Sequence, residues 1–489
     1  MKRREFLQKS AAATLSALGL LLKHYVLASP ALLRSAEAES GAQLFALQKA
    51  LNSSDALLLL PSDGQYVNYQ NAFNLRTALS PQARVMVRTP RGLAQLIQWL
   101  RRTKVPFAIR GGGHSYEGFS QSERIVIDTR LMNSIELAPS KQSVFIGGGA
   151  ALGDVYSALG PKGITIPAGS CPPVGVSGHV QGGGFGEFAR PFGLACDSLL
   201  SVDLVNADGV EITASETENS DLFWAIRGGG GGSFGVATRY QFRTHAVSEL
   251  TSFGVTWLLR GERALDACKD WQKWIATAPD FVTSFLRIDV SHSQNVTLHA
   301  AGLGLCSEAK LQAELQKITR EKPNHQRLEP MNIVQAVHHF AGGNAYQSVH
   351  MKAKSDYLYE PLSDDGIRAL FAGLQKHQGI TATMDGYGGA IAKVAPTATA
   401  FAHRKALCCI QYSTSFEPEK TEASLASMKE FYDGLRGYMS GECYVNYPDL
   451  DLKNYAAAYW GENLARLKQI KASVDPTNFF QHAQSIPIG

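Results

Sequence analysis

The sequence predicts a two-lobed α+β protein, and three features of the chain lead to this prediction. The chain has 489 residues, which is long enough for two or three domains with hydrophobic cores. Residues 85–245 alternate short β-like runs with helical runs and contain several glycine clusters. Residues 250 to about 430 have fewer glycine clusters and longer mixed segments. The last 60 residues are again rich in motif-like sequence, and we expect this segment to pack against the first lobe.

The N-terminus predicts an export signal. The pair Arg3–Arg4 precedes Phe6 and an apolar stretch, Ala11–Leu22. Twelve residues cannot span a hydrocarbon core, which needs about 20. Residues 1–38 therefore resemble a twin-arginine signal, with cleavage expected at Ala36-Glu37-Ala38 or near Ala28. The resemblance implies the twin-arginine export machinery as a partner, a periplasmic or secreted location, and no membrane anchor in the mature protein.

Local patterns predict the elements of the first lobe. Thr89 and Pro90 are typical of a helix start, and apolar residues at 93, 96, 97 and 100 give one buried face through about Arg102. Three apolar runs favour strands: Val105–Ile109, Ile125–Ile127 and Val144–Ile146. A hairpin is expected from Leu199–Asn206, the Asp208-Gly209 turn and Glu211–Ala214. In the second lobe, Thr251–Leu259 is a mixed segment and Ala264–Ala278 has a helical pattern.

Charge and cysteine content exclude some functions. The net charge is +4, and six basic and two acidic residues lie in the first 38 positions, so the remainder has 41 residues of each sign. A nucleic-acid-binding protein that neutralises phosphates is therefore not expected. Seven cysteines, an odd number, leave at least one thiol outside any disulfide scheme. The chain has no H-E-x-x-H motif and no paired C-x-x-C, so no metal site is predicted.

Two familiar glycine motifs occur in a context that argues against them. Residues 230–235 satisfy both G-x-G-x-x-G and G-x-S-x-G. Each motif requires a strand before it and a helix after it. Here a helical run, Asp221–Ile226, comes first and a strand-like run, Val236–Phe242, follows. We therefore assign neither a dinucleotide fingerprint nor a serine nucleophile to this segment.

Two other glycine-rich segments are more informative. Arg110-Gly111-Gly112-Gly113-His114-Ser115-Tyr116 directly follows an expected strand. Gly169-Ser170-Cys171-Pro172-Pro173-Val174-Gly175-Val176-Ser177-Gly178-His179 precedes Gly182-Gly183-Gly184-Phe185-Gly186. Consecutive glycines can turn several backbone N–H groups toward one anion, such as a pyrophosphate. The histidine and cysteine add two nucleophiles that can bond to an electrophilic ring.

These segments, together with residues 444–450 and 475–480, closely resemble berberine-bridge-enzyme-like FAD-linked oxidases of the vanillyl-alcohol oxidase (PCMH-type) superfamily. The resemblance implies an FAD-binding PCMH-type domain at 80–247 and a substrate domain at 248–430, with an antiparallel sheet backed by helices. A C-terminal segment, 431–489, returns to the FAD domain. The implied cofactor is FAD, attached through His114 and Cys171. The other residues expected to bind it are Arg110, Gly111, Gly112, Gly113, Ser115, Gly169, Ser170, Val174, Gly175, Ser177, Gly178, His179, Gly182, Gly183, Gly184 and Asn446.

The resemblance implies a glutamate or a tyrosine as catalytic base. Gln411 falls at the glutamate position, and an amide cannot accept a proton. Tyr447 is therefore the first candidate, with Tyr444 beside it. A tyrosine titrates near pH 10, so we expect positive charge or hydrogen bonds to lower the pKa of Tyr447. Alternatively, Asp385 relays the proton, although it could equally be a simple turn residue before Gly386. Tyr116 is expected either to line the substrate pocket or to pack within its loop.

The predicted function is an FAD-dependent oxidase. It would transfer a hydride from a hydroxyl or hemiacetal carbon of a sugar or another alcohol, with dioxygen as acceptor and hydrogen peroxide as product. Val174 occupies the position that the family associates with access of dioxygen, and Phe185 lacks the tyrosine hydroxyl of many relatives. The alternatives are an oxidative tailoring enzyme for a secondary metabolite, a flavin-carrying protein without turnover, and a glycine-rich structural protein.

Overall fold

The computed structural model describes residues 41–70, 72–342 and 345–489. The predicted export signal lies outside these residues. Residues 41–50 are helical and belong to a separate compact unit, whereas residues from Leu51 onward form one unit that holds the sheets. No helix among the described residues has the length and apolar character to cross a membrane. The mixed α+β prediction is confirmed: among the described residues, the first lobe has a four-stranded, a five-stranded and a two-stranded sheet, and the second lobe has one large sheet.

The first sheet positions the first glycine loop, which begins at Gly111, directly after strand β3. It has the strand order β1-β2-β4-β3, and β2, β3 and β4 are parallel. The predicted helix is confirmed as α3 (Pro90–Thr103), and the Thr89 side chain accepts a hydrogen bond from the Gly92 N–H. The third strand starts later than predicted because Pro106 has no N–H for the ladder. The strands are β1 (Ala56–Leu59), β2 (Ala83–Val87), β3 (Phe107–Arg110) and β4 (Ile125–Asp128). The sheet includes β1, which lies upstream of the predicted boundary at 80.

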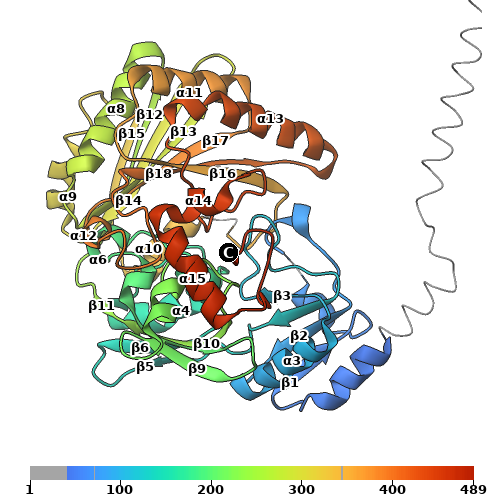
Figure 1. Cartoon of the computed structure of the whole chain (residues 1–489). Helices are drawn as coiled ribbons and strands as arrows, with labels where there is room; N and C mark the ends of the chain where they lie inside the picture. The colour runs from blue at the N-terminus through green and yellow to red at the C-terminus, as the bar shows by residue number, and fades with distance from the viewer. Residues whose placement is uncertain (1–40, 71, 343–344) are drawn as a thin grey trace, which may run out of the picture. The chain divides into compact units, whose positions relative to one another are not determined.

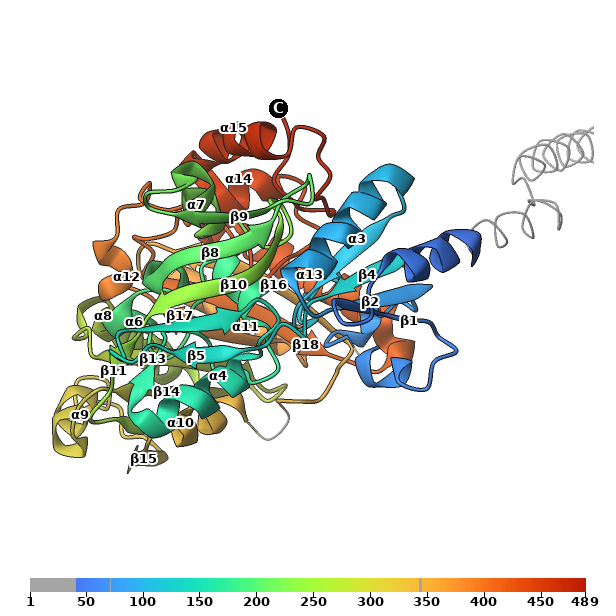
Figure 2. The ribbon, with the colours of Figure 1, turned by 90° about the horizontal axis from the view of Figure 1, so that it is seen from below.

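The second sheet of this lobe is antiparallel, in the order β5-β6-β10-β8-β9 (Figure 2). The predicted hairpin is present, and Gly209 at its turn has a φ of +72°. The strands are β5 (Ile135–Leu137), β6 (Ser143–Gly147), β8 (Leu199–Val205), β9 (Glu211–Ser215) and β10 (Val236–Arg243). Beside them lie β7 (Ile164–Thr165), β11 (His245–Ala246), α4 (Leu152–Leu159), α5 (Val176–Gln181), α6 (Ala189–Phe192) and α7 (Ser220–Ile226).

The second lobe is a seven-stranded antiparallel sheet, in the order β15-β12-β14-β13-β17-β18-β16, with helices α8, α11 and α13 on one face (Figure 1). This confirms the expected antiparallel sheet backed by helices. The strands are β12 (Thr251–Leu259), β13 (Val282–Val290), β14 (Val296–Gly304), β15 (His325–Pro330), β16 (Met351–Leu358), β17 (Thr381–Gly386) and β18 (Cys408–Ser415). The helices of this region are α8 (Gly261–Thr277), α9 (Glu308–Leu315), α10 (Ile333–Ala341), α11 (Asp364–Lys376), α12 (Ala390–Lys393) and α13 (Thr421–Gly434).

Strand alternation decides which side chains of this sheet face the first lobe. Met384 and Ile410 lie in the hydrophobic core under the helices. Successive side chains of a strand point to opposite faces, so Asp385 and Cys409, which are register partners, face the other way. The sheet therefore directs the Asp385 carboxyl group toward the first lobe, while the neighbouring Met384 packs in the core under the helices.

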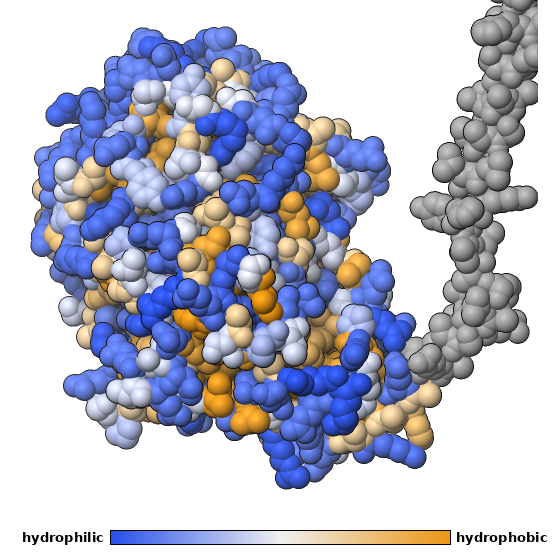
Figure 3. All heavy atoms as spheres, viewed as in Figure 1, coloured by the Kyte–Doolittle hydropathy of each residue, from blue (hydrophilic) through white to orange (hydrophobic). Residues whose placement is uncertain are grey.

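The C-terminal segment crosses back to the first lobe. Its helices, α14 (Tyr455–Trp460) and α15 (Leu464–Val474), lie at one edge of the molecule in Figure 2, where α15 packs against α7 of the first lobe. The buried Lys471 ammonium donates hydrogen bonds to the Asp475 carboxylate and to the carbonyl oxygens of Ser233 and Phe480. Hydrophobic side chains gather near these helices on a face that is mostly hydrophilic (Figure 3). The segment is thus fixed to the glycine-rich loop before β10.

Candidate active site

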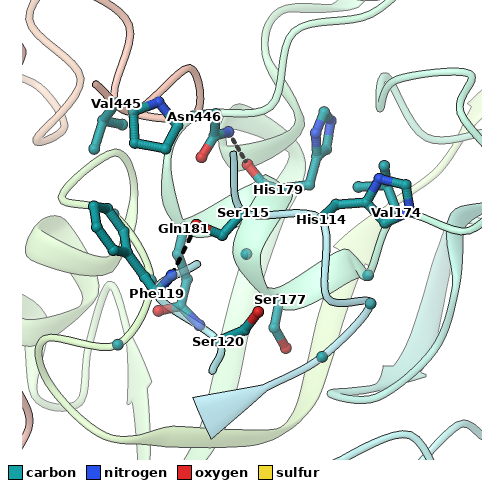
Figure 4. Close-up of a pocket in the computed structure, with 18 of the residues that line it drawn as sticks. His114, Ser115, Phe119, Ser120, Val174, Ser177, His179, Gln181, Val445 and Asn446 are labelled. Atoms are coloured by element: carbon teal, nitrogen blue, oxygen red, sulfur yellow. Dashed lines mark hydrogen bonds between the residues drawn. The ribbon is translucent and has the colours of Figure 1, made fainter. Parts of the chain in front are cut away.

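The first lobe, the site-facing side of the large sheet and the C-terminal segment enclose a cavity of about 430 Å³. Glycine loops form much of its wall, and tyrosine and phenylalanine side chains form much of the rest. The close-up in Figure 4 shows His114, Val174, His179 and Asn446 around this space. The two informative glycine-rich segments and the C-terminal motif, which are far apart in the chain, thus meet at one site.

Close backbone contact between two loops requires glycine. A Cβ atom on Gly112 would lie 2.2 Å from the Gly175 nitrogen, and one on Gly175 would lie 2.3 Å from the Gly112 nitrogen. Gly113 has a φ of +76°, which side-chain-bearing residues rarely adopt. These glycines bring the His114 loop and the Cys171 loop together.

Other glycines border open space. A Cβ atom on Gly111 or Gly178 would meet no atom within 4 Å, and both residues line the cavity. Gly231 faces Gly178, since its Cβ position is 3.5 Å from the Gly178 Cα. Side chains here would fill space that a ligand can use. The residues present therefore fit a long, narrow dinucleotide such as FAD.

The glycine run 229–232 belongs to this cavity wall, which the sequence analysis missed. The order of helix α7, loop and strand β10 is as predicted, so the two motif templates remain rejected. The run has no helix after it to signal a nucleotide site. The run reaches the cavity wall because the Gln181 carbonyl accepts hydrogen bonds from the Gly228 and Gly230 N–H groups. These bonds fix the loop beside α5.

The glycines of the second segment divide into two groups. Gly169, Gly175 and Gly178 line the cavity, but Gly182, Gly183 and Gly184 lie behind its wall. Cβ atoms on the latter three would lie 2.0 Å, 2.8 Å and 2.7 Å from Asn446, Phe401 and Ala195, respectively. Close packing therefore explains these three glycines in the structure, and their role in binding the cofactor stays a prediction. Arg110 also lies outside the lining residues, 3.9 Å from the Asp128 carboxylate.

The His114 imidazole is held as a neutral ring. It stacks on Phe73 with ring centroids 4.6 Å apart. Burial, assisted by the Arg110 charge, lowers the pKa of His114 to about 4. A neutral imidazole keeps a nitrogen lone pair, which is required of a nucleophile. Ser115, next in the chain, accepts a hydrogen bond from the Phe119 N–H (Figure 4) and shapes the turn.

Cys171 lines the cavity and is half-buried, whereas the other six cysteines are buried. All seven are free thiols in the structure. Burial, together with the Glu187 charge, raises the pKa of the Cys171 thiol to about 11. Ser170 donates a hydrogen bond of 2.7 Å to Glu187 Oε1. The loop thus places one accessible thiol beside an acidic side chain.

His179, Tyr444 and Asn446 support the wall. His179 Nε2 accepts a hydrogen bond from the Gly169 N–H, and burial lowers its pKa to about 4. Asn446 donates to the His179 carbonyl at 2.8 Å (Figure 4) and to the Tyr444 hydroxyl at 2.9 Å. That hydroxyl also accepts from the N–H groups of Gly184 and Phe185. Tyr444 therefore fixes the loop, and burial raises its pKa.

The environment of Tyr447 is opposite to the prediction. We expected positive charge or hydrogen bonds to lower the pKa of Tyr447, but its hydroxyl donates a hydrogen bond of 3.1 Å to Asp385 Oδ2. Burial and the negative charge of Asp385 raise the pKa of Tyr447 well above its usual value. Burial raises the pKa of Asp385 to about 7, against the lowering effect of the Tyr447 hydrogen bond. The group with a pKa near neutrality is thus the carboxyl of Asp385, which lies at the end of β17 rather than in a turn.

Tyr116 and Gln411 form a second pair. Gln411 Nε2 donates to the Tyr116 hydroxyl at 2.9 Å, and burial raises the pKa of Tyr116 to about 12. The Tyr116 and Tyr447 rings stack with centroids 5.8 Å apart and an interplanar angle of 10°. Tyr116 lines the cavity, as one of its two predicted roles requires, whereas Gln411 acts on it from behind the wall.

Glu187 and His482 line the cavity and were not selected from the sequence. Glu187 directly follows the motif Gly182–Gly186, and its position in the sequence does not indicate that its side chain lines the cavity. His482 stacks on Phe119 at 4.4 Å, and its Nε2 lies 3.2 Å from the Gly231 carbonyl. Burial lowers the pKa of His482 to about 4, so it contributes no charge.

A buried network of ion pairs anchors the two tyrosine-bearing segments. Lys352 on β16 lies 2.6 Å from both Glu117 and Asp449. Lys354, two residues further along the strand, contacts Asp449 and Asp451. Glu117 directly follows Tyr116, and Asp449 is two residues from Tyr447. One strand therefore positions the stacked pair of rings from both sides.

Comparisons with known proteins give matches along most of the chain. The FAD binding domain family model matches residues 81–215, and the berberine and berberine like model matches residues 443–487. The FAD-linked oxidoreductase YgaK of Bacillus subtilis (strain 168) is 32% identical over 437 residues, which cover 87% of this chain and 95% of that protein. The structure of Physcomitrella patens BBE-like 1 has a TM-score of 0.84 at 31% identity and covers 91% of this chain and 99% of its own. A chitooligosaccharide oxidase has a TM-score of 0.82 at 27% identity, over 91% of this chain and all of its own.

Proposed function

Because the chain belongs to the berberine-bridge-enzyme-like FAD-linked oxidoreductases of the PCMH-type superfamily, we propose that it oxidises a hydroxyl or hemiacetal carbon of a sugar or another alcohol. FAD bound here would supply a hydride acceptor for this carbon, with dioxygen as the final electron acceptor and hydrogen peroxide as the product. The observation that carries the proposal is the hydrogen bond between Tyr447 and Asp385 inside the glycine-lined cavity.

Asp385 is the proton acceptor in this proposal. Its pKa of about 7 makes it an effective base near neutral pH. The Tyr447 hydroxyl, which lies 3.1 Å away, can take the proton of the substrate hydroxyl while it gives its own proton to Asp385. The high pKa of Tyr447 requires these two transfers to occur together, because a free phenolate is unfavourable here.

His114 and Cys171 are proposed to hold the flavin covalently. Both side chains line the cavity, on loops that the Gly112–Gly175 contact brings together. The neutral imidazole of His114 supports its role as a nucleophile. Val174, in the same wall, is proposed to leave a path for dioxygen, as its position in the family implies. The resemblance of residues 1–38 to a twin-arginine signal is the basis for the further proposal of a periplasmic or secreted enzyme that is loaded with cofactor before export.

Oxidation of a secondary metabolite is the second candidate. The aromatic side chains that line the cavity include Tyr116, Tyr447, Phe185 and Phe285. Phe185 and Phe285 have centroids 5.9 Å apart in an edge-on arrangement. Such walls also pack well against an aromatic substrate. The likeness to a chitooligosaccharide oxidase supports the sugar alternative.

The test combines flavin bleaching with peroxide release. Purified holoprotein is mixed anaerobically with neutral mono- and oligosaccharides, aryl alcohols and polyphenols, and the flavin absorbance is recorded before air is admitted. We expect at least one hydroxyl compound to bleach the flavin, and air to restore its colour with one peroxide per turnover. A Val174→Leu variant should recover its colour more slowly than the wild type.

Two results would contradict the proposal. If no compound bleaches the flavin, the protein is a carrier or acts on another substrate class. If the bleached protein persists for minutes in air but artificial acceptors restore its colour at once, it is a dehydrogenase rather than an oxidase.

A further inference from the structure

The charged groups that line the cavity are acidic. Glu187 and Asp385 are the carboxyl side chains, and the described lining residues include no lysine or arginine. The lining histidines His114, His179 and His482 are neutral, because burial lowers each pKa to about 4. Around Glu187 and Asp385 the wall therefore favours neutral or cationic groups of a substrate over carboxylate groups.

Glu187 has an oxygen atom that the protein leaves without a partner. The residue is 7% exposed and sits between α5 and α6, just after Gly186. Its Oε1 accepts the hydrogen bond from Ser170, which fixes the side chain. Its Oε2 is buried and accepts no hydrogen bond from another residue within the described part of the chain, while the Glu187 backbone N–H also acts on the carboxylate. A buried, unsatisfied carboxylate oxygen is costly, so such an atom is expected to meet a donor from a ligand.

Glu187 and Asp385 influence each other. The Glu187 charge contributes to the raised pKa of Asp385, and burial raises the pKa of Glu187 itself to about 6. A cation close to Glu187 would offset this repulsion and favour the ionised form of Asp385. Binding of a cation and readiness of the proton acceptor are therefore coupled.

The aromatic wall also suits a cation. Phe185, two residues before Glu187, stacks on Tyr387 at 4.8 Å and meets Phe285 edge-on, so its position is fixed. An ammonium group over an aromatic face is attracted by the negative face of the ring. Glu187 thus adds a carboxylate to a pocket whose rings tolerate positive charge.

We propose that Glu187 Oε2 binds a protonated amino group of the substrate, which makes an amino sugar or another amino alcohol the preferred substrate class. The inference rests on the proposed oxidase function and deepens it. Asp385 and Tyr447 remain the groups that take the hydroxyl proton, while Glu187 positions the substrate through its charge. The amine is bound and stays unreacted.

The test compares three sugars that share one ring and one hemiacetal carbon: D-glucosamine, D-glucose and D-glucuronate. Wild-type holoenzyme, Glu187→Gln and the exposed control Glu419→Gln are each mixed anaerobically with them, and the concentration dependence of bleaching gives an apparent Kd. Wild type should bind glucosamine best and glucuronate worst. Because a charge-assisted hydrogen bond is lost, Glu187→Gln should weaken glucosamine binding about tenfold and change glucose binding less than about twofold. Glu419→Gln should behave as wild type.

A binding measurement without turnover accompanies it. D-glucosaminitol and D-glucitol lack the hemiacetal carbon, and their binding is followed by the change in flavin absorbance. If glucosaminitol binds to wild type and only weakly to Glu187→Gln while no sugar bleaches the flavin, the ammonium site stands and the oxidase proposal fails. If glucosaminitol binds no better than glucitol, or Glu187→Gln weakens all ligands equally, the inference is overturned.

A third measurement distinguishes a role of Glu187 in substrate binding from a role in flavin attachment. The flavin that stays attached after denaturation, the flavin absorbance spectrum and the melting temperature are recorded for each variant. Normal values in Glu187→Gln, with lost selectivity for the amine, support the proposal. Loss of the Cys171 linkage with unchanged sugar selectivity would assign Glu187 to flavin attachment instead.

Discussion

At the scale of single residues, the motifs identified most of the side chains that meet in the cavity. His114, Cys171, Tyr116 and Tyr447 each stand in or next to a recognisable segment, so the sequence was sufficient to select them. The protonation of Tyr447 could not be obtained in the same way. It depends on Asp385, which is 62 residues away in the chain, and on burial that only the assembled lobes create. Glu187 was missed for the same reason.

Replacement of the proton acceptor should change both the rate and its pH dependence. In the wild type, the rate of anaerobic bleaching should rise as the pH increases through about 7, because Asp385 must lose its proton to act. Asp385→Asn should lower this rate by about 10²–10⁴ and abolish the rise. The measurement is stopped-flow absorbance from pH 5 to 9.

The control for this experiment is Asp266→Asn, on the exposed side of α8. The pKa of Asp385 is coupled electrostatically to four neighbouring groups: Tyr447, Tyr116, Glu187 and the Cys409 thiol. Among these four groups, Glu187 has the lowest pKa, about 6. The profile of Glu187→Gln therefore shows which part of the rise belongs to Asp385. A rise near pH 7 that persists in Asp385→Asn would assign the proton transfer elsewhere.

At the scale of elements, local patterns predicted the helix after Thr89 and the hairpin of β8 and β9, because caps, turns and short-range alternation determine both. The order of the seven-stranded sheet joins β13 to β17 across more than 90 residues, and no local signal encodes such a pairing. The alignment of β16 with the C-terminal segment is equally non-local. Its lysines, which would read as solvated charges in a sequence, are buried in ion pairs.

Lys352 should be a structural determinant of the tyrosine pair. Lys352→Met removes a cation that two buried carboxylates share, which should destabilise the fold by about 3 kcal/mol because the charges lose a partner. The loosened loop should also raise the apparent Kd for substrate more than it lowers the limiting rate of bleaching. Urea unfolding and anaerobic bleaching measure the two effects.

Lys429→Met is the matched control. Lys429 pairs with Asp433 on the exposed surface of α13, where an ion pair contributes little. Its unfolding midpoint should equal that of the wild type. Equal midpoints for Lys352→Met and Lys429→Met would show that the buried network does not hold the two lobes in place.

At the scale of the whole molecule, the two-lobed arrangement followed from composition and motif order, but the shape of the cavity did not. Each wall comes from a different lobe or from the C-terminal segment, and packing alone determines which glycines face the space. Gly182–Gly184 pack behind the wall, whereas the run 229–232, which the sequence analysis set aside, lines it. Identical glycine runs can thus serve either purpose, depending on what folds against them.

Covalent attachment of the cofactor should be visible when the whole molecule is unfolded. Acid-denatured wild type should keep its flavin, and His114→Ala or Cys171→Ala should each keep it through the remaining bond. The double variant His114→Ala/Cys171→Ala should release it to the supernatant. Flavin fluorescence of the denatured protein in a gel measures the bound fraction. Flavin release by the wild type, or retention by the double variant, would contradict the assignment of these two residues.

The route of the C-terminal segment also constrains the order of events during synthesis. Tyr447 closes one side of the cavity and His482 another, and both leave the ribosome long after the His114 and Cys171 loops have emerged. A nascent chain can therefore fold its glycine loops early but still expose them to water on two sides. The nucleotide cavity is therefore fully enclosed only after the residues up to Gln484 have folded against the first lobe.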